Sequence, residues 1–204
     1  ALRRGAANLE KHIENIGKFG VPAVVAVNVF PTDTEAELAL LEELCAHLGA
    51  PAVRSEVWAK GGEGGLAMAD AVDAALRQPA HFHPIYDAAK PIAEKIETIA
   101  REIYGADGVD FTDAAKKQLA EMDALGMTET PVCMAKTQYS FSDNPALLGR
   151  PSGFRITVRE LRASCGAGFV VALTGNVLTM PGLPKVPAAM GMDITADGVI
   201  TGLF

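Results

Sequence analysis

The chain has 204 residues, of which 49% are hydrophobic and 21% charged, so it carries enough apolar side chains for a sizeable core in one large or two modest domains. Its 18 Lys and Arg against 25 Asp and Glu give a formal net charge of −7, which excludes a general nucleic-acid binder and a protein held on anionic membranes by charge. No apolar run reaches the roughly 18 residues that a membrane-spanning helix needs. An anionic ligand therefore requires a local pocket.

Near the N-terminus the sequence predicts a helix followed by a buried strand. Apolar residues at near-helical spacing predict an amphipathic helix over residues 9–19 that ends at Gly20. The β-branched run 22–29 lacks polar alternation, which is typical of a parallel strand covered on both faces. Thr32 and Glu35 then predict a capping box that begins the next helix.

The same order of elements follows a second time. The helix after the first strand is expected to end at Gly49, and residues 52–57 predict a second strand, parallel to the first. An Ala-rich helix is predicted over residues 66–76. Because parallel sheets bind ligands at the carboxyl ends of their strands, we expect the functional site in the two segments that follow these strands.

Beyond a Pro- and His-containing boundary at residues 78–84, the pattern changes. A helical region is predicted over residues 85–104, with a break or a second helix start at Pro91, and Thr112 is predicted to cap a helix that ends at Gly126. Short strands are predicted at residues 132–135, 154–161, 169–173 and 177–180, and a hairpin over residues 193–203 that turns at Asp197 and Gly198.

Cysteine usage is typical of a reducing compartment, and a cytoplasmic location is expected. Cys45, Cys133 and Cys165 are odd in number, widely spaced and without a C-x-x-C pair, so we expect reduced, buried thiols, with one reactive cysteine as the alternative. The first residues lack the order of a signal peptide and begin within a helical pattern without a Met. We therefore expect this chain to be a piece of a longer protein.

The segment after the first strand combines an amide, an aromatic ring, a hydroxyl and a carboxylate. Asn28 and Asp33 suit the donor and acceptor edges of a heterocyclic base, and Phe30 offers a face for stacking. In the alternative interpretation Thr32 caps a helix, Asp33 favours the helix dipole, and Phe30 belongs to the core. The pattern leaves both interpretations open.

The segment after the second strand holds Trp58, the only tryptophan of the chain, followed by Lys60 and a glycine run over residues 61–65. Glycine-rich backbone before a helix can bind an anion through its N–H groups, although Glu63 opposes a phosphate site. The run does not match the P-loop pattern G-x-x-x-x-G-K-[ST]. A flexible start to the next helix is the alternative.

Other concentrations of polar residues carry weaker signals. Residues 133–144 are dense in hydroxyls and amides, for which ordinary turns are favoured over a site. His81 and His83 have no cysteine nearby, and no G-x-S-x-G motif occurs, so neither a zinc hydrolase nor a serine hydrolase is indicated, and we expect no metal held by this chain.

Several strings in the chain, taken together, resemble the formate–tetrahydrofolate ligase family. The resemblance runs from Asn8 to the end and rests first on residues 24–35, 57–64 and 134–143. Further strings occur in the same order at residues 103–106, 148–154, 179–188 and 202–204. The resemblance implies an α/β fold: residues 1–80 would be the C-terminal portion of a parallel-sheet, P-loop-type nucleotide- and folate-binding domain, and residues 81–204 a smaller α+β region.

The resemblance also implies a reaction. Formate and ATP give formyl phosphate, and N10 of tetrahydrofolate then takes the formyl group to give 10-formyltetrahydrofolate. Mg²⁺ and a monovalent cation, K⁺ or NH₄⁺, assist, and the full-length enzyme is expected to be a homotetramer that binds neither nucleic acid nor membrane. The family's phosphate-binding loop has no counterpart in these 204 residues, so we expect the chain alone to be inactive. The alternative is a non-catalytic subunit that complements a separate P-loop-bearing chain.

The resemblance assigns binding residues but no catalytic ones. Phe30 and Trp58 match the aromatic residues that hold the pterin. Residues expected near the nucleotide are Asn28, Pro31, Thr32, Asp33, Lys60, Gly61, Gly62 and Gly64.

Overall fold

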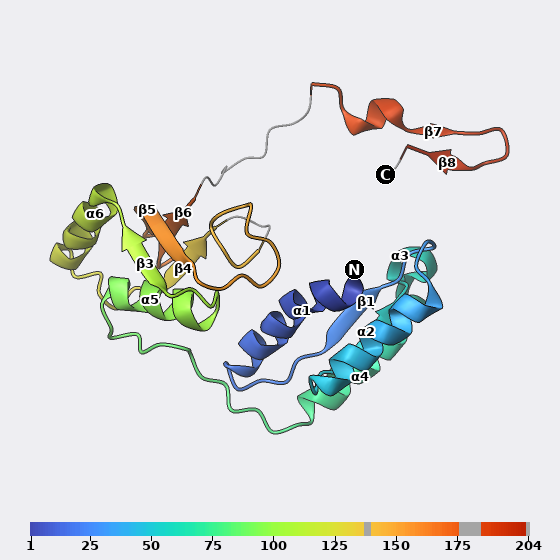
Figure 1. The fold of residues 1–204 in the computed structure, drawn as a ribbon, viewed down its shortest axis with the longest axis horizontal. Helices are drawn as coiled ribbons and strands as arrows, with labels where there is room; N and C mark the ends of the chain where they lie inside the picture. The colour runs from blue at the N-terminus through green and yellow to red at the C-terminus, as the bar shows by residue number, and fades with distance from the viewer. Residues whose placement is uncertain (137–139, 176–184, 203–204) are drawn as a thin grey trace.

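The computed structural model describes residues 1–136, 140–175 and 185–202, and its first unit is built on a small parallel sheet (Figure 1). The elements of this unit are α1 (Leu2–Gly17), β1 (Val25–Asn28), α2 (Glu35–His47), β2 (Ala52–Ser55), α3 (Val57–Lys60), the 3₁₀ helix η1 (Gly61–Gly65) and α4 (Leu66–Leu76). Strands β1 and β2 pair in parallel, which confirms the predicted α/β fold. Asn28 lies opposite Ser55 where the strands end, so the segments that follow them leave the sheet at the same edge.

The predicted start of α2 was wrong by two positions. The N-cap is Thr34, whose side chain accepts a hydrogen bond from the Glu37 N–H while the Glu37 carboxylate accepts one from the Thr34 N–H. Residues 30–33 form a turn in which the Phe30 N–H donates to Asp33 Oδ2 at 2.8 Å and the Asp33 N–H donates to the Phe30 carbonyl at 3.0 Å. Because Asp33 closes this turn, the helix begins after it rather than at Thr32.

The second unit is a mixed four-stranded sheet covered by helices. Its elements are α5 (Ile92–Glu102), β3 (Gly108–Phe111), α6 (Asp113–Ala124), β4 (Val132–Ala135), β5 (Arg155–Ser164) and β6 (Phe169–Thr174). The strand order is β3-β5-β6-β4, with β5 and β6 antiparallel and the outer strands parallel to their neighbours. The core of this unit contains fully buried aliphatic side chains from α5 and the sheet: Ile92, Ile96, Ile156, Val158 and Val170.

The predicted elements of this unit are mostly present. Strands β4, β5 and β6 are confirmed, as is Thr112, whose hydroxyl caps α6 by accepting a hydrogen bond from the Ala115 N–H at 3.2 Å. Helix α5 starts at Pro91, its N-cap, as one of the two predictions had it, and not at residue 85, because proline disfavours a helical conformation at the residue before it. Strand β3 was not predicted. The strand predicted at residues 177–180 lies outside the described residues.

A short 3₁₀ helix, η2 (Ala188–Gly191), precedes the hairpin of β7 (Asp193–Ile194) and β8 (Ile200–Thr201). The two strands pair antiparallel, and Gly198 has a φ of 79° in the turn between them. This confirms the predicted hairpin and its turn, where glycine relieves the strain of a left-handed backbone.

Cysteine burial follows position in the fold. Cys45 is buried on α2, whereas Cys133 and Cys165 are exposed, so the prediction of buried thiols was wrong for these two. Cys133 lies on β4 at the edge of the sheet, and Cys165 lies in the turn between β5 and β6.

Within the described ranges, the helices are all too short or too polar to cross a bilayer.

Helix α1 connects the two units through side-chain hydrogen bonds. Lys11 Nζ donates to the Glu102 carbonyl at 3.0 Å, and Asn15 Nδ2 donates to the Ile103 carbonyl at 2.8 Å. Glu14 lies 2.7 Å from the Arg150 guanidinium. The predicted division at residue 80 stays a prediction, because these bonds tie the first helix to the second unit.

The ion pairs of Glu14 predict a loss of stability in acid. The hydrogen bond from Lys11, followed by the positive charges of Lys11, Arg150 and Lys18, lowers the pKa of Glu14. A lowered folded-state pKa adds stability above the ordinary value of about 4.3, and this stability is lost as pH falls through the folded value. Since Glu14 is partly exposed, we expect a contribution of only about 0.5 kcal/mol.

Urea denaturation between pH 3 and pH 6 checks this expectation. Glu14→Gln should show a shallower decline of unfolding free energy in acid than the wild type. Glu43→Gln, at an exposed position of α2, should follow the wild-type curve. Identical curves for all three proteins would contradict the assignment.

Candidate ligand-binding site

A pocket opens at the edge of the first sheet, where β1 and β2 end. It encloses about 830 Å³, a volume typical of sites for small molecules and cofactors. The residues that line it come from the two strand ends and the segments after them: Asn28, Phe30, Pro31, Thr32, Ser55, Val57 and Trp58. The pocket therefore lies where the parallel strands were expected to place a site.

Two aromatic rings lie nearly parallel to each other in this pocket. The ring centroids of Phe30 and Trp58 lie 6.4 Å apart, and the ring planes differ by 20°. Phe30 is 48% exposed and Trp58 61% exposed, so neither ring belongs to the core. This excludes the interpretation of Phe30 as a core residue. Exposed aromatic rings held nearly parallel are available for stacking with a planar ligand.

Hydrogen bonds hold the Trp58 ring and the Phe30 backbone in place. The indole Nε1–H of Trp58 donates to the Val29 carbonyl at 2.8 Å, which ties α3 to the end of β1. Asp33 holds the Phe30 backbone in the turn before α2. A flat ring that stacks on both faces at about 3.5 Å needs about 7 Å between the rings. The 6.4 Å between the ring centroids is an upper limit on the spacing of the two ring planes, so the rings must move apart to admit a planar heterocycle.

Polar groups lie at the strand ends beneath the rings. Asn28 is exposed and Ser55 is 9% exposed, and the two residues are register partners in the sheet. An amide and a hydroxyl supply both donors and acceptors for the edge of a heterocycle. The sequence analysis missed Ser55 and Val57. Ser55 could have been found from the strand register, because a residue paired with Asn28 in a parallel sheet must lie at the same end of the sheet as Asn28.

The remaining predicted site residues lie outside the pocket lining. Lys60 pairs with Glu56 at 2.6 Å, one helical turn away. Gly61 and Gly62 belong to η1, which makes the predicted loop a helical turn. The Glu56 N–H donates to the Gly64 carbonyl at 3.1 Å, and a Cβ on Gly64 would lie 2.5 Å from the Glu56 carbonyl carbon. Close backbone packing therefore accounts for glycine at position 64.

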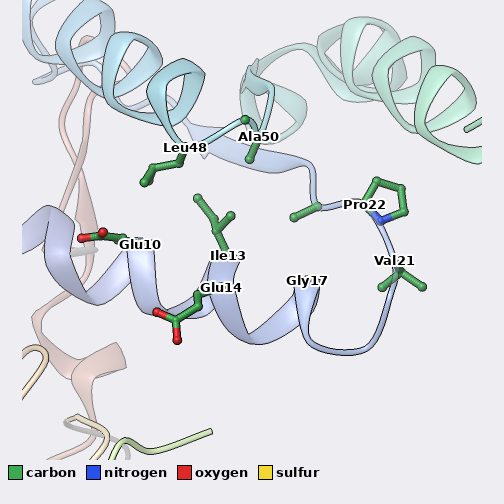
Figure 2. Close-up of a pocket in the computed structure, with 10 residues that line it drawn as sticks. Glu10, Ile13, Glu14, Gly17, Val21, Pro22, Leu48 and Ala50 are labelled. Carbon is green, nitrogen blue, oxygen red and sulfur yellow. The ribbon is translucent and has the colours of Figure 1, made fainter. Parts of the chain in front are cut away.

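A second cavity, of about 410 Å³, lies between α1 and the end of α2 (Figure 2). Figure 2 shows Ile13 pointing from α1 toward Leu48 and Ala50. Glu10 and Glu14 lie along its edge, and Glu14 already pairs with Lys11 and Arg150. Aliphatic side chains and engaged carboxylates do not suit a planar heterocycle, so the pocket with the two rings is the better candidate.

The fold and the pocket define an α/β protein with a pocket that holds two aromatic rings at the carboxyl ends of parallel strands. The family model for formate–tetrahydrofolate ligase matches residues 1–204. The chain therefore belongs to the formate–tetrahydrofolate ligase family. Members of this family are ATP-dependent ligases of one-carbon metabolism, and their substrates include formate, ATP and tetrahydrofolate.

Magnesium, which the resemblance implies, needs several oxygen ligands in octahedral geometry. Among the described residues, no group of three or more His, Cys, Asp or Glu is placed to hold a metal ion. Two carboxylates adjoin the pocket residues in sequence: Asp33 accepts the hydrogen bond from Phe30, and Glu56 pairs with Lys60. The described residues do not fit a magnesium site of their own, and no step is assigned to the ion here.

Proposed function

We propose that this chain supplies the pterin-binding side of the site at which a formate–tetrahydrofolate ligase joins formate to tetrahydrofolate. The observation that carries the proposal is the pair of exposed, nearly parallel rings of Phe30 and Trp58, 6.4 Å apart. A bicyclic pterin is flat and aromatic, so it gains stacking energy beyond its buried area between two such faces. Family membership supports tetrahydrofolate as the planar ligand.

The proposed reaction passes through formyl phosphate. ATP transfers a phosphoryl group to formate, and the N10 lone pair of tetrahydrofolate then attacks the formyl carbon while phosphate leaves. The role of this pocket is to bind and orient the folate, because reacting atoms held in position avoid the entropic cost of encounter. Residues 28 and 31–33, with Lys60 and the glycines at 61, 62 and 64, are proposed to lie near the nucleotide.

The phosphate charge in this reaction needs cationic groups. Lys60 is held by Glu56, and the sequence has no P-loop motif, so we propose that those groups come from outside these 204 residues. Exposed apolar side chains of α4 support cover by further protein: Leu66 at 63%, Val72 at 42% and Leu76 at 78%. Magnesium, K⁺ or NH₄⁺, a homotetramer and a cytoplasmic location belong to the same proposal.

An activity assay of the chain by itself tests this division of labour. We expect no 10-formyltetrahydrofolate from the 204-residue chain with formate, ATP and tetrahydrofolate, and restored production when a P-loop-bearing chain is added. Turnover by the chain alone at the rate of a complete ligase would show that its own residues grip the phosphates. The P-loop-bearing chain can then be varied. If it still restores production after its own aromatic pterin-binding residues have been removed, the folate-binding role belongs to the 204-residue chain.

Trp58→Ala is expected to weaken tetrahydrofolate binding by about 1–3 kcal/mol, taking stacking of a nucleic-acid base on an aromatic side chain as the measure. Trp58→Phe keeps a flat face and loses only the indole N–H bond to Val29, so it should recover most of the affinity. Because Trp58 is the only tryptophan, its variants have no tryptophan fluorescence to follow. Tetrahydrofolate affinity is therefore measured by calorimetry for the variants and by fluorescence quenching for the wild type.

Phe82→Ala provides the matched control, because Phe82 is also an exposed aromatic residue, at 69%, and does not line the pocket. It should bind tetrahydrofolate like the wild type. Unchanged affinity in Trp58→Ala would remove Trp58 from the site. Thermal melting should change little in the Trp58 variants, since the indole is largely exposed.

A further inference from the structure

A third recess lies between α1 and the second unit, away from the pocket that holds Phe30 and Trp58. It encloses about 370 Å³ and is lined by residues brought together from distant parts of the chain. Helix α1 contributes His12, Asn15 and Ile16, and the second unit contributes Tyr104, Lys136 and Phe141. The folate-binding proposal uses none of these residues.

Positive charge in the recess comes from Lys136. Its ammonium lies 5.4 Å from the centroid of the Tyr104 ring and donates a hydrogen bond to the Ser140 carbonyl. Burial, together with the nearby charge of Lys136, lowers the pKa of His12, so His12 is neutral at pH 7. An ammonium held at the wall of a partly apolar recess favours an anionic ligand group such as a carboxylate.

Asn15 carries an acceptor that has no donor among the described residues. The residue is 7% exposed, and its Nδ2 donates to the Ile103 carbonyl at 2.8 Å. Its buried Oδ1 accepts no hydrogen bond from any residue that the structure describes. A buried acceptor without a donor destabilises the fold. A ligand that carries an O–H or N–H group would satisfy this oxygen.

Apolar side chains complete the recess. Ile16 and Phe19 line it from the first unit, and Phe141, 3% exposed, lies against the His12 ring at a centroid distance of 4.7 Å. We propose that this recess binds a small carboxylate that carries an apolar group and an O–H or N–H donor. Lys136 would bind the carboxylate, Asn15 the donor, and the aromatic and aliphatic walls the apolar group.

Mandelate and phenylacetate test the ligand class, because they share a phenyl group and a carboxylate and differ in the hydroxyl. NMR titration of the 204-residue chain follows the imidazole C–H signals, with His47 and His83 as internal references. Mandelate should shift the His12 signal saturably and raise its pKa, because a carboxylate offsets the Lys136 charge. Phenylacetate should bind roughly 2- to 10-fold more weakly, the effect of one neutral hydrogen bond.

Lys136→Met tests the charge, and Lys90→Met is the matched control, since Lys90 is an exposed lysine paired with Glu94. Lys136→Met should weaken mandelate binding by about tenfold or more, as expected for a charge-assisted bond, and Lys90→Met should not. Absence of a saturable His12 shift, or equal shifts at all histidines, would overturn the site. Equal affinity for mandelate and phenylacetate would overturn the role of Asn15 and with it the ligand class.

Discussion

Ile156→Ala is expected to lower the free energy of unfolding by about 2–5 kcal/mol. Ile156 is 0% exposed on β5, where it is paired with Val109 of β3. It belongs to the core that also contains Ile96 and Val158, side chains that are themselves fully buried. Truncation removes buried methylene groups and leaves a cavity that packed neighbours fill only in part, so both losses add.

Urea denaturation followed by circular dichroism measures this change. Ile156→Val should fall between wild type and alanine, with a loss of about 0.5–1.5 kcal/mol. Leu125→Ala is the control, since Leu125 is 76% exposed, and its effect should stay within about 0.5 kcal/mol. A loss at Ile156→Ala no larger than that at Leu125→Ala would show that β5 does not form the centre of the core.

Patterns that involve neighbouring residues predicted the fold well. The β-branched run around β1 predicted a parallel strand, and the strand is present. The prediction that both of its faces are covered was wrong, since only Val27 is buried and Ala26 is exposed among the described residues of the strand. Thr112 was predicted as a cap from its own residue type, and Gly198 as a turn residue from the pair Asp-Gly. In each case the physical cause lies within a few residues of the feature, so it can be recognised without the tertiary structure.

Features that depend on distant partners were missed. Strand β3 spans only Gly108–Phe111, and its apolar residues are too few to show a period. It forms because β5 offers it a parallel edge, some 45 residues further along the chain. The start of α2 was misplaced for a related reason, since Asp33 prefers the turn with Phe30 to the helix.

The candidate site shows the same division. The segments that hold Phe30 and Trp58 were predicted to meet because each follows a strand, and parallel strands end at one edge of a sheet. The choice of these two rings as the pterin-binding pair came from the family resemblance. The surroundings of Lys60 were not predicted, because its pairing with Glu56 depends on residues 57–60 being helical rather than a loop. Ser55 becomes a site residue only through the register of β1 and β2.

Lys95→Ala is expected to lower the free energy of unfolding by about 2–5 kcal/mol, as for other large-to-small changes of a buried side chain. Lys95 is 0% exposed on α5, and its Nζ donates to the Thr128 carbonyl at 2.7 Å and the Thr130 carbonyl at 3.1 Å. The same ammonium lies 5.9 Å from the centroid of the Tyr86 ring. The side chain thus ties the segment after α6 to α5.

Lys95→Met separates the packing of the chain from its hydrogen bonds, because methionine keeps most of the methylene volume and cannot donate. It should recover about half of the loss in Lys95→Ala, whereas Lys90→Ala, at an exposed position, should stay within about 0.5 kcal/mol of the wild type.

Burial lowers the pKa of Lys95 below its ordinary value of about 10.4. Between the folded and unfolded pKa values only the unfolded chain holds the proton, so wild-type stability relative to Lys95→Met should rise with pH in that window. A wild-type advantage that is constant up to pH 10, or a Lys95→Ala variant as stable as Lys90→Ala, would show that Lys95 is not a buried, desolvated ammonium.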